Sequence, residues 1–201
     1  MDLNIQGKKA LVTASGRGLG RAMVRALAAE GVEVAFVARS SDDINALSKE
    51  LSTTAVPHLG IALDLMPEGA PQELASRLDA SRFKDIDIVV HNLGGTLELS
   101  DPMCSVSDWR KVWRLNMEVA IELNLHVLPG MQERGWGRII TTTSHGATGL
   151  LGQPIFAAAM GGVLSMTRAI AFENATTGVT ANCLSPGAGT RLPAVARPTF
   201  E

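Results

Sequence analysis

Residues 9–31 read KALVTASGRGLGRAMVRALAAEG. An apolar run is followed by a turn with glycines at positions 16, 18 and 20, and then by a segment with helical spacing that closes at Gly31. Glycines at such a turn let the backbone approach a pyrophosphate, and the helix behind it aims free N–H groups and its positive dipole end at the anion. This order predicts a dinucleotide-binding segment; a glycine turn without a ligand is the alternative.

The same alternation continues along the chain. Apolar strand-like runs occur at 32–39, 56–65, 86–95, 137–143 and 178–187, and helical spacing occurs at 41–51, 71–80, 107–134 and 155–173. Strands with few polar residues that alternate with helices are typical of a parallel sheet buried on both faces. We therefore expect an α/β fold, a doubly wound Rossmann-type parallel sheet with helices on both faces, formed by one domain over residues 1–201.

Composition narrows the classes of function. The 201 residues are 46% hydrophobic with a net charge of -2, which predicts a globular domain without the basic field that nucleic acid attracts. We expect no membrane span, and the acidic start MDLNIQGKK argues against a secretory signal, so a cytoplasmic location is expected. Cys104 and Cys183 lack a CxxC partner, and the four histidines lack metal-ligand spacing, so neither a disulfide framework nor a metal site is expected.

The end of the second strand indicates which dinucleotide binds. An acid there would accept hydrogen bonds from the ribose 2′-hydroxyl of NAD, but this chain has Arg39 and Ser40, with Arg17 in the glycine loop. Two guanidiniums and no carboxylate suit a 2′-phosphate, so NADP(H) is favoured over NAD(H). Asp42 and Asp43 follow and are interpreted as acids of the first turn of a helix.

Several short motifs, in order on these elements, resemble the short-chain dehydrogenase/reductase family over essentially the whole chain. They are TASGRGLG with Ala14 in place of the family's first glycine, LDL with Asp64, HNLGG with His91 in place of an asparagine, Asn116, Ser144, and SPG followed by Thr190. The resemblance implies cofactor contacts from Thr13, Ser15, Gly16, Arg17, Gly18, Leu19, Gly20, Arg39, Ser40, Asp64, Leu65, Asn92, Gly94, Pro186, Gly187 and Thr190.

The resemblance also implies hydride transfer between the nicotinamide and a small-molecule carbonyl or alcohol, catalysed by a tetrad. Its asparagine and serine correspond to Asn116 and Ser144, but the tyrosine, twelve residues after the serine, and the lysine, four further on, are Phe156 and Met160. Phenylalanine keeps the ring and loses the proton, whereas methionine keeps nearly the length of lysine and loses its charge. The chain has no tyrosine, so the sequence predicts an oxidoreductase with a degraded tetrad and very low activity.

Other interpretations of this site stay open. The chain is alternatively a catalytically inactive NADP-binding partner of an active homologue, or His145 has become the acid, although neighbouring residues leaving a strand point to opposite sides. A shifted alignment would make Phe156 and Met160 ordinary core residues. A methyltransferase is disfavoured, because a nucleoside without phosphates has no use for Arg17 and Arg39.

The sequence says less about the substrate and the oligomeric state than about the cofactor. Candidate pocket residues are Leu93, Leu150, Gln153, Thr190, Arg191 and Leu192. Arg191 and Arg197 are interpreted as surface residues, with an anion site as the alternative.

After SPG the chain is shorter than the family pattern, so the family's last strand is expected to be missing and the sheet edge unpaired. The resemblance places the subunit contacts on helices 107–134 and 155–173, and the small residues at 157–162 predict a homodimer or homotetramer.

Overall fold

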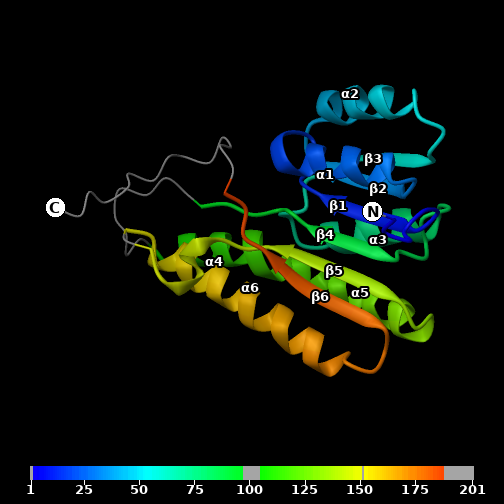
Figure 1. The fold of residues 1–201 in the computed structure, drawn as a ribbon. Coiled ribbons are helices and arrows are strands. Elements are labelled where there is room, and N and C mark those ends of the chain that lie inside the picture. The colour runs from blue at the N-terminus through cyan, green and yellow to red at the C-terminus, as the bar shows by residue number, and fades with distance from the viewer. Residues whose placement is uncertain (1, 97–104, 151, 188–201) are drawn as a thin grey trace.

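The computed structural model describes residues 2–96, 105–150 and 152–187. Six strands form one parallel sheet with the order β3-β2-β1-β4-β5-β6 (Figure 1). The strands are β1 (Lys9–Thr13), β2 (Glu33–Ala38), β3 (His58–Ala62), β4 (Ile88–His91), β5 (Gly137–Thr142) and β6 (Val179–Leu184). The α-helices are α1 (Gly18–Ala29), α2 (Ser41–Leu51), α3 (Ala70–Asp79), α4 (Val106–Trp113), α5 (Val119–Glu133) and α6 (Pro154–Glu173).

Two apolar cores lie on the two faces of the sheet, so the doubly wound fold class is confirmed. On one face α1 and α2 bury Val24 and Leu47 against Phe36 of β2. On the other face α3 and α5 bury Leu74 and Leu123 against β1, β4 and β5. The polar residues on these helices therefore face outward, which is the cause of the 3.6-residue spacing seen in the sequence.

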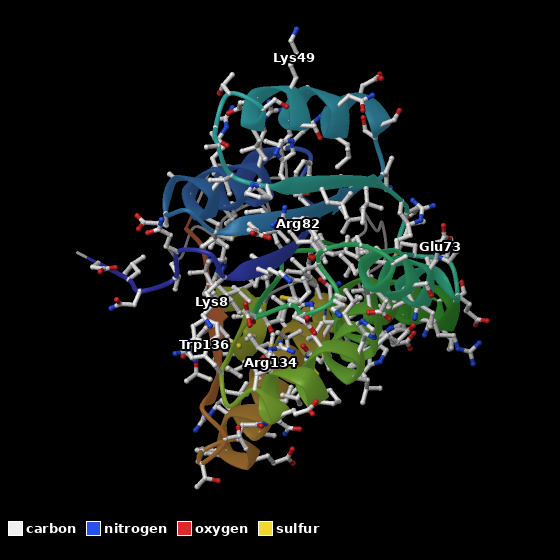
Figure 2. The ribbon with its side chains drawn as sticks, turned by 90° about the vertical axis from the view of Figure 1, so that its right-hand side faces the viewer. Lys8, Lys49, Glu73, Arg82, Arg134 and Trp136 are labelled. Atoms are coloured by element: carbon white, nitrogen blue, oxygen red, sulfur yellow. The ribbon has the colours of Figure 1, made fainter. Side chains whose placement is uncertain are left out.

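The expectation that the sheet is buried on both faces holds for its centre but not for β6. Residues 179–184 alternate between buried and more exposed positions, with Thr180 and Asn182 exposed. Trp136, which precedes β5, has Lys8 Nζ 4.2 Å from its ring centroid (Figure 2). Arg138 Cζ also lies 4.2 Å from this centroid. The burial of residues along β6 alternates as in a strand that has one face in the core and the other face exposed.

The long helix expected at 107–134 is interrupted. A π-helical turn at Arg114–Glu118 joins α4 to α5 without a break in the chain direction. Asn116 lies in this turn, where its Nδ2 donates to the carbonyl of Val112 at 2.7 Å and to the carbonyl of Gly95 at 2.8 Å. The turn therefore directs a buried amide from a helix into the loop after β4, as π-turns at functional sites commonly do.

Helix α6 is more apolar than the sequence analysis allowed for. Within the part of the chain that is described, it alone is long and apolar enough to cross a membrane by length and composition, with a mean hydropathy of 1.6. In this fold α6 packs against β6, α4 and the short 3-10 turn at His145–Thr148, burying Ile155, Ala159 and Val163. These contacts bury 33% of the apolar stretch inside the chain.

The glycines of α6 also have neighbours within the chain. A Cβ on Gly161 would lie 3.1 Å from the carbonyl oxygen of Ala147, and one on Gly162 would lie 3.4 Å from Met117 Sδ. The sequence analysis took this run of small residues as a sign of subunit contact. The structure gives Gly161 and Gly162 close packing partners in the 3-10 turn and the π-turn of the same chain, and the expected subunit contact stays a prediction.

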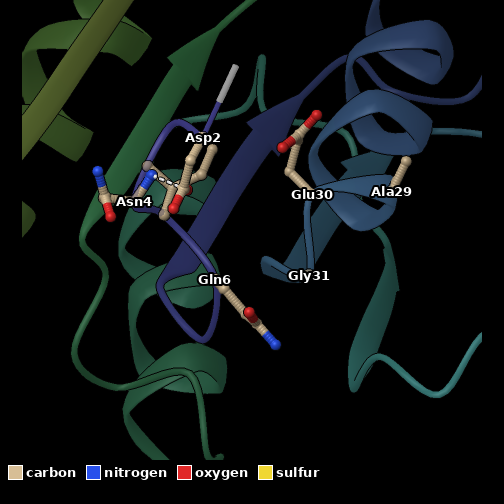
Figure 3. Close-up of a pocket in the computed structure, with 7 residues that line it drawn as sticks. Asp2, Asn4, Gln6, Ala29, Glu30 and Gly31 are labelled. Carbon is tan, nitrogen blue, oxygen red and sulfur yellow. Dashed lines mark hydrogen bonds between the residues drawn. The ribbon is translucent and has the colours of Figure 1, made fainter.

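A recess of about 290 Å³ lies before β1, lined by Asp2, Asn4, Gln6, Glu30 and Gly31 among others (Figure 3). Asp2 accepts a hydrogen bond from the N–H of Asn4 at 2.8 Å within it. This edge of the sheet carries the amino ends of the strands. In doubly wound sheets ligands bind at the opposite edge, outside the carboxyl ends.

Candidate cofactor and active site

The amino end of α1 is open to an anion. Arg17 is its N-cap residue but makes no side-chain cap hydrogen bond, and the first turn contains no acid. In contrast, α2 and α4 are capped by the hydroxyls of Ser40 and Ser105. The first N–H groups of a helix have no partner inside it, so they are available together with the positive dipole end. This arrangement fits the pyrophosphate of a dinucleotide.

The glycine loop is held tightly to its surroundings. Ser15 donates through both its backbone N–H and its Oγ to the carbonyl of Val37, at 3.1 Å in each case. Ala14 has a φ of 51°, in the left-handed region that glycine adopts most easily, which is why a glycine suits this position in the family pattern. Gly20 lies so close to the loop that a Cβ on it would be 2.4 Å from the carbonyl oxygen of Ala14.

The loop after β4 joins the glycine loop at the point where the strand order reverses. Thr13 Oγ1 accepts hydrogen bonds from the N–H groups of Asn92 at 2.9 Å and Leu93 at 3.0 Å. Asn92 Nδ2 donates to the carbonyl of Ala14 at 3.2 Å. The structure thus brings Thr13, Asn92 and the glycines together at the topological switch point, where doubly wound sheets bind nucleotides.

The residues expected at the adenosine end lie around the ends of β2 and β3. Arg39 is exposed and makes no ion pair with any residue in the described ranges, whereas Arg17 Nε donates to Asp43 Oδ2 at 2.7 Å. Asp64 is exposed and accepts a hydrogen bond from the N–H of Met66 at 3.1 Å. The side chain of Leu65 is buried in the core, so a cofactor contact there would involve its backbone.

Asn116 is fixed by backbone groups on two sides. Besides its two Nδ2 hydrogen bonds, its Oδ1 accepts from the N–H of Gly95 at 2.9 Å. A Cβ on Gly94 would lie 2.9 Å from the same oxygen, so the glycine permits the close approach. Asn116 therefore positions the loop after β4 in the described conformation, and all its polar atoms have partners within the chain.

Ser144, Phe156 and Met160 come together after β5. Ser144 Oγ accepts a hydrogen bond from the N–H of Gly146 at 3.2 Å, and a Cβ on Gly146 would lie 3.6 Å from Cε1 of the Phe156 ring. One turn further along α6, the carbonyl of Met160 accepts a hydrogen bond from Thr143 Oγ1 at 3.2 Å. Ser144 and Phe156 are thus linked through Gly146, and Met160 is linked to the end of β5 through Thr143, which the sequence analysis did not single out.

Phe156 and Met160 are buried among apolar side chains. Their exposed fractions are 8% and 4%, and their cluster includes Val112 of α4 and Met117 of the π-turn. A phenyl ring and a thioether are well matched to these surroundings, in which an unpaired ammonium would be poorly solvated. Phe156 and Met160, which the resemblance placed at the family's tyrosine and lysine positions, are therefore packing elements that carry no acidic proton or positive charge.

The histidines and lysines of the described chain are the other groups that could supply a proton or a positive charge. His91 is buried in β4 with its Nε2 2.7 Å from Asn124 Oδ1, and burial lowers its pKa to about 4, so it is neutral at neutral pH. His145 is exposed at the start of the 3-10 turn. The lysines, all at or before residue 111, are Lys8, Lys9, Lys49, Lys84 and Lys111.

Some of the other residues predicted for the cofactor and substrate sites lie in the described ranges, and some do not. Pro186 and Gly187 follow β6, and Leu150 and Gln153 precede α6, where the N–H of Gln153 donates to the carbonyl of Leu150 at 3.1 Å. Within the described ranges, no group of three His, Cys, Asp or Glu side chains could hold a metal ion. The residues that lie outside the described ranges are Cys104, Thr190, Arg191, Leu192 and Arg197.

A parallel sheet whose strand order reverses beside an uncapped glycine loop defines a Rossmann-type dinucleotide-binding protein. The short chain dehydrogenase family matches residues 8–194. The 3-oxoacyl-[acyl-carrier-protein] reductase FabG of Escherichia coli is 32% identical over 186 residues, which are 92% of this chain and 75% of that protein. The D-beta-hydroxybutyrate dehydrogenase of Cupriavidus necator is 32% identical over 185 residues, covering 91% of this chain and 71% of that protein.

Solved structures with a similar fold support the same family as the sequence relatives. L-sorbose reductase from Gluconobacter frateurii, complexed with NADPH and L-sorbose, superposes with a TM-score of 0.87 at 28% identity, covering 93% of this chain and 72% of that one. A putative NAD(P) dependent gluconate 5-dehydrogenase from Beutenbergia cavernae with bound NADP gives 0.83 at 29% identity, covering 92% and 74%. The chain belongs to the short-chain dehydrogenase/reductase family, whose members are NAD(P)-binding oxidoreductases.

Proposed function

We propose that this protein is an NADP(H)-dependent oxidoreductase for small carbonyl or alcohol substrates whose turnover is very slow because of its degraded tetrad. The observation that carries the proposal is the open amino end of α1 beside an unpaired Arg39. The cofactor supplies or accepts the hydride. The chain binds the pyrophosphate at α1, holds the loop after β4 through Asn116, and presents the Ser144 hydroxyl at a turn whose Gly146 lies against the ring of Phe156.

The slow turnover follows from Phe156 and Met160. Proton transfer to or from the substrate oxygen needs a group with a labile proton, and general acid–base catalysis typically contributes ~10²- to 10⁴-fold to the rate. Phe156 has no such proton, and Met160 has no charge with which to orient a ribose or lower a neighbouring pKa. The reductases among the relatives do not favour the alternative, a catalytically inactive partner of another enzyme.

Arg39 provides the test of cofactor preference. We expect NADPH to bind more tightly than NADH, because a guanidinium can make a bidentate, charge-assisted contact with the 2′-phosphate worth about 1.5–3 kcal/mol. In Arg39→Ala the ratio of the NADPH and NADH affinities should therefore fall by about tenfold or more, with NADH affinity nearly unchanged. Calorimetric titration of both proteins with both cofactors measures this. Equal affinities of the unmodified protein for NADPH and NADH would contradict the proposal.

We also propose that the protein is a homodimer or homotetramer that associates through the outer faces of α5 and α6. Leu125 on α5 and Phe172 on α6 are large apolar side chains with exposed fractions of 72% and 73%. Trp113 at the end of α4 is 40% exposed. Exposed apolar side chains of this size are commonly covered by a partner subunit. Light scattering at micromolar concentration should give at least twice the chain mass, and a monomer would contradict the proposal.

A further inference from the structure

The π-turn that carries Asn116 also carries Arg114, whose side chain reaches the loop between β3 and α3. Arg114 Nε donates a hydrogen bond to the carbonyl of Met66 at 3.1 Å, and its Nη2 donates to the carbonyl of Pro67 at 3.1 Å. These carbonyls belong to residues that lie 48 and 47 positions earlier in the chain. One planar guanidinium therefore holds two successive residues of a distant loop with two donors in a fixed geometry.

The same loop carries the residues that the family resemblance places at the adenosine end of the cofactor. Asp64 and Leu65 directly precede Met66, and the N–H of Met66 donates to Asp64 Oδ1 at 3.1 Å. Met66 thus accepts a hydrogen bond from Arg114 and donates one to Asp64. The guanidinium is therefore linked through one residue to the carboxylate expected at the adenine.

Arg114 is itself held in place on its other side. Its side chain is 13% exposed, and its Nη1 forms ion pairs with Glu118, at 3.5 Å, and with Glu122 of α5. Glu122 also accepts a hydrogen bond from Gln72 Nε2 of α3 at 2.7 Å. All three guanidinium nitrogens of Arg114 have acceptors within the chain, so this group is suited to supporting a loop rather than to binding a phosphate directly.

The π-turn therefore supports two loops of the cofactor site. Arg114 holds the loop after β3 through Met66, and Asn116 holds the loop after β4 through both backbone groups of Gly95. Both loops leave the carboxyl edge of the sheet, where doubly wound folds bind nucleotides. The contacts of Asn116 are those of a residue that the resemblance had singled out, whereas Arg114 had no expected role.

We propose that Arg114 is a positioning residue for the adenosine half of the cofactor. Its two carbonyl contacts fix the loop after β3, and with it Asp64 and the backbone of Leu65. The inference rests on the proposed dinucleotide-dependent function, but it does not depend on which of NADPH and NADH is preferred. Loss of the forked contact should weaken every ligand that contains the adenosine, because binding must then order the loop.

Arg114→Gln is the first variant, titrated calorimetrically with NADPH and with ADP-ribose, which contains the adenosine and pyrophosphate but no nicotinamide. We expect both ligands to bind about five- to tenfold more weakly, by the same factor within about twofold. Equal losses would place the effect on the adenosine half. Thermal melts of each variant establish that it is folded at the titration temperature.

Arg134→Gln is the matched control. Arg134 is also a partly buried arginine that holds a loop, since its Nη2 donates to the carbonyl of Ile86 at 2.7 Å and it pairs with Asp85 and Asp87. That loop precedes β4 and lies at the amino edge of the sheet. The control removes the same charge and should lower the melting temperature, but it should change the affinity for NADPH and ADP-ribose by less than about twofold.

Arg114→Lys separates the forked contact from the charge. The ammonium keeps a positive charge beside Glu118 and Glu122, but it cannot reproduce the planar fork that meets two carbonyls. We expect a melting temperature close to that of the unmodified protein and ADP-ribose binding that is weaker by about threefold or more. Full ADP-ribose affinity in Arg114→Lys would overturn the proposal, because the charge alone would then suffice. This variant also decides the question if Arg114→Gln does not fold.

A double-mutant cycle with Asp64→Ala tests the route through the loop. If Arg114 acts by placing Asp64, then Arg114→Lys/Asp64→Ala should weaken ADP-ribose binding by less than the product of the two single effects. A loss equal to that product would show that Arg114 acts independently of Asp64 and would contradict the inference.

Two other results would overturn the inference while leaving the proposed function intact. These are a folded Arg114→Gln protein that binds ADP-ribose as tightly as the unmodified protein does, and an equal loss of affinity in Arg134→Gln. In contrast, unmodified protein that binds neither NADPH nor ADP-ribose contradicts the proposed function itself, and the inference with it.

Discussion

Phe156→Tyr combined with Met160→Lys is expected to raise the rate of NADPH oxidation with carbonyl substrates by at least about 10²-fold over the unmodified protein. The two positions are one helical turn apart on α6, so their side chains share a face of the helix. A phenol at position 156 would supply the proton beside the Ser144 turn. An ammonium at position 160 would lower the pKa of that phenol through its charge. The assay follows NADPH absorbance over a panel of ketones, aldehydes and acyl thioesters.

The single variants should gain little, because the two groups act as one unit. In Phe156→Tyr the phenol would keep a pKa near ~10 without a neighbouring cation, so its proton transfer at neutral pH stays poor. In Met160→Lys the ammonium would lie in a cluster where the native side chain is 4% exposed. Its charge would be poorly compensated there, which should lower the thermal stability as well as leave the rate unchanged. The gain of the double variant should therefore exceed the product of the single gains.

Phe172→Tyr combined with Met160→Lys is the matched control. It introduces the same two residue types, but Phe172 lies at the exposed end of α6, far along the helix from the Ser144 turn. We expect no gain in rate from this pair. A Phe156→Tyr/Met160→Lys variant that binds NADPH but turns over no faster than the unmodified protein contradicts the assignment of these positions. Rapid turnover by the unmodified protein shows instead that another acid acts, and exposed His145 is the first candidate.

The elements of this fold were predictable where local chemistry and apolar spacing agree. The helix expected at 41–51 spans those residues, because Ser40 caps it and Ile44, Leu47 and Leu51 recur on one face. The parallel order of the strands followed from their apolar composition and the helices between them. Residues far apart in sequence, such as Thr13 and Asn92, could be placed together because they lie at the carboxyl ends of strands that end at one edge of the sheet.

Features that depend on tertiary contacts were not predictable. A single-residue insertion in the helical period leaves the apolar spacing nearly unchanged, so the π-turn that carries Asn116 was missed. Asp43 is an acid of the first turn of α2, as expected, but nothing in the local sequence shows that its carboxylate also meets Arg17, 26 residues earlier. The packing of the α6 glycines against Ala147 and Met117 of the same chain was also missed. In each case the deciding partner is distant in sequence.

Gly20 is the position next to the glycine loop that leaves the least space for a side chain. A Cβ there would lie 2.4 Å from the carbonyl oxygen of Ala14, 2.7 Å from Asn92 Nδ2 and 2.9 Å from the Cα of Ser15. Two of these three atoms belong to the backbone, so the clash cannot be relieved by a side-chain rotation. Helix α1 would have to move away from the loop, and the hydrogen bond from Asn92 to Ala14 would be lost. The first N–H groups of α1 would move with it.

We therefore expect Gly20→Ala to lower the free energy of unfolding by about 2 to 4 kcal/mol, or roughly 5–15 °C in Tm, and to weaken NADPH binding by about tenfold or more. Gly130→Ala is the control, because it makes the same change inside α5, where the only nearby atoms belong to the end of the flexible Arg134 side chain. Alanine is the better helix former, so this variant should be neutral or more stable by up to about 1 kcal/mol, with NADPH affinity unchanged. Thermal denaturation and calorimetric titration of both variants measure these effects. A Gly20→Ala protein as stable and as tight a binder as Gly130→Ala would show that α1 is not held against the glycine loop by close packing.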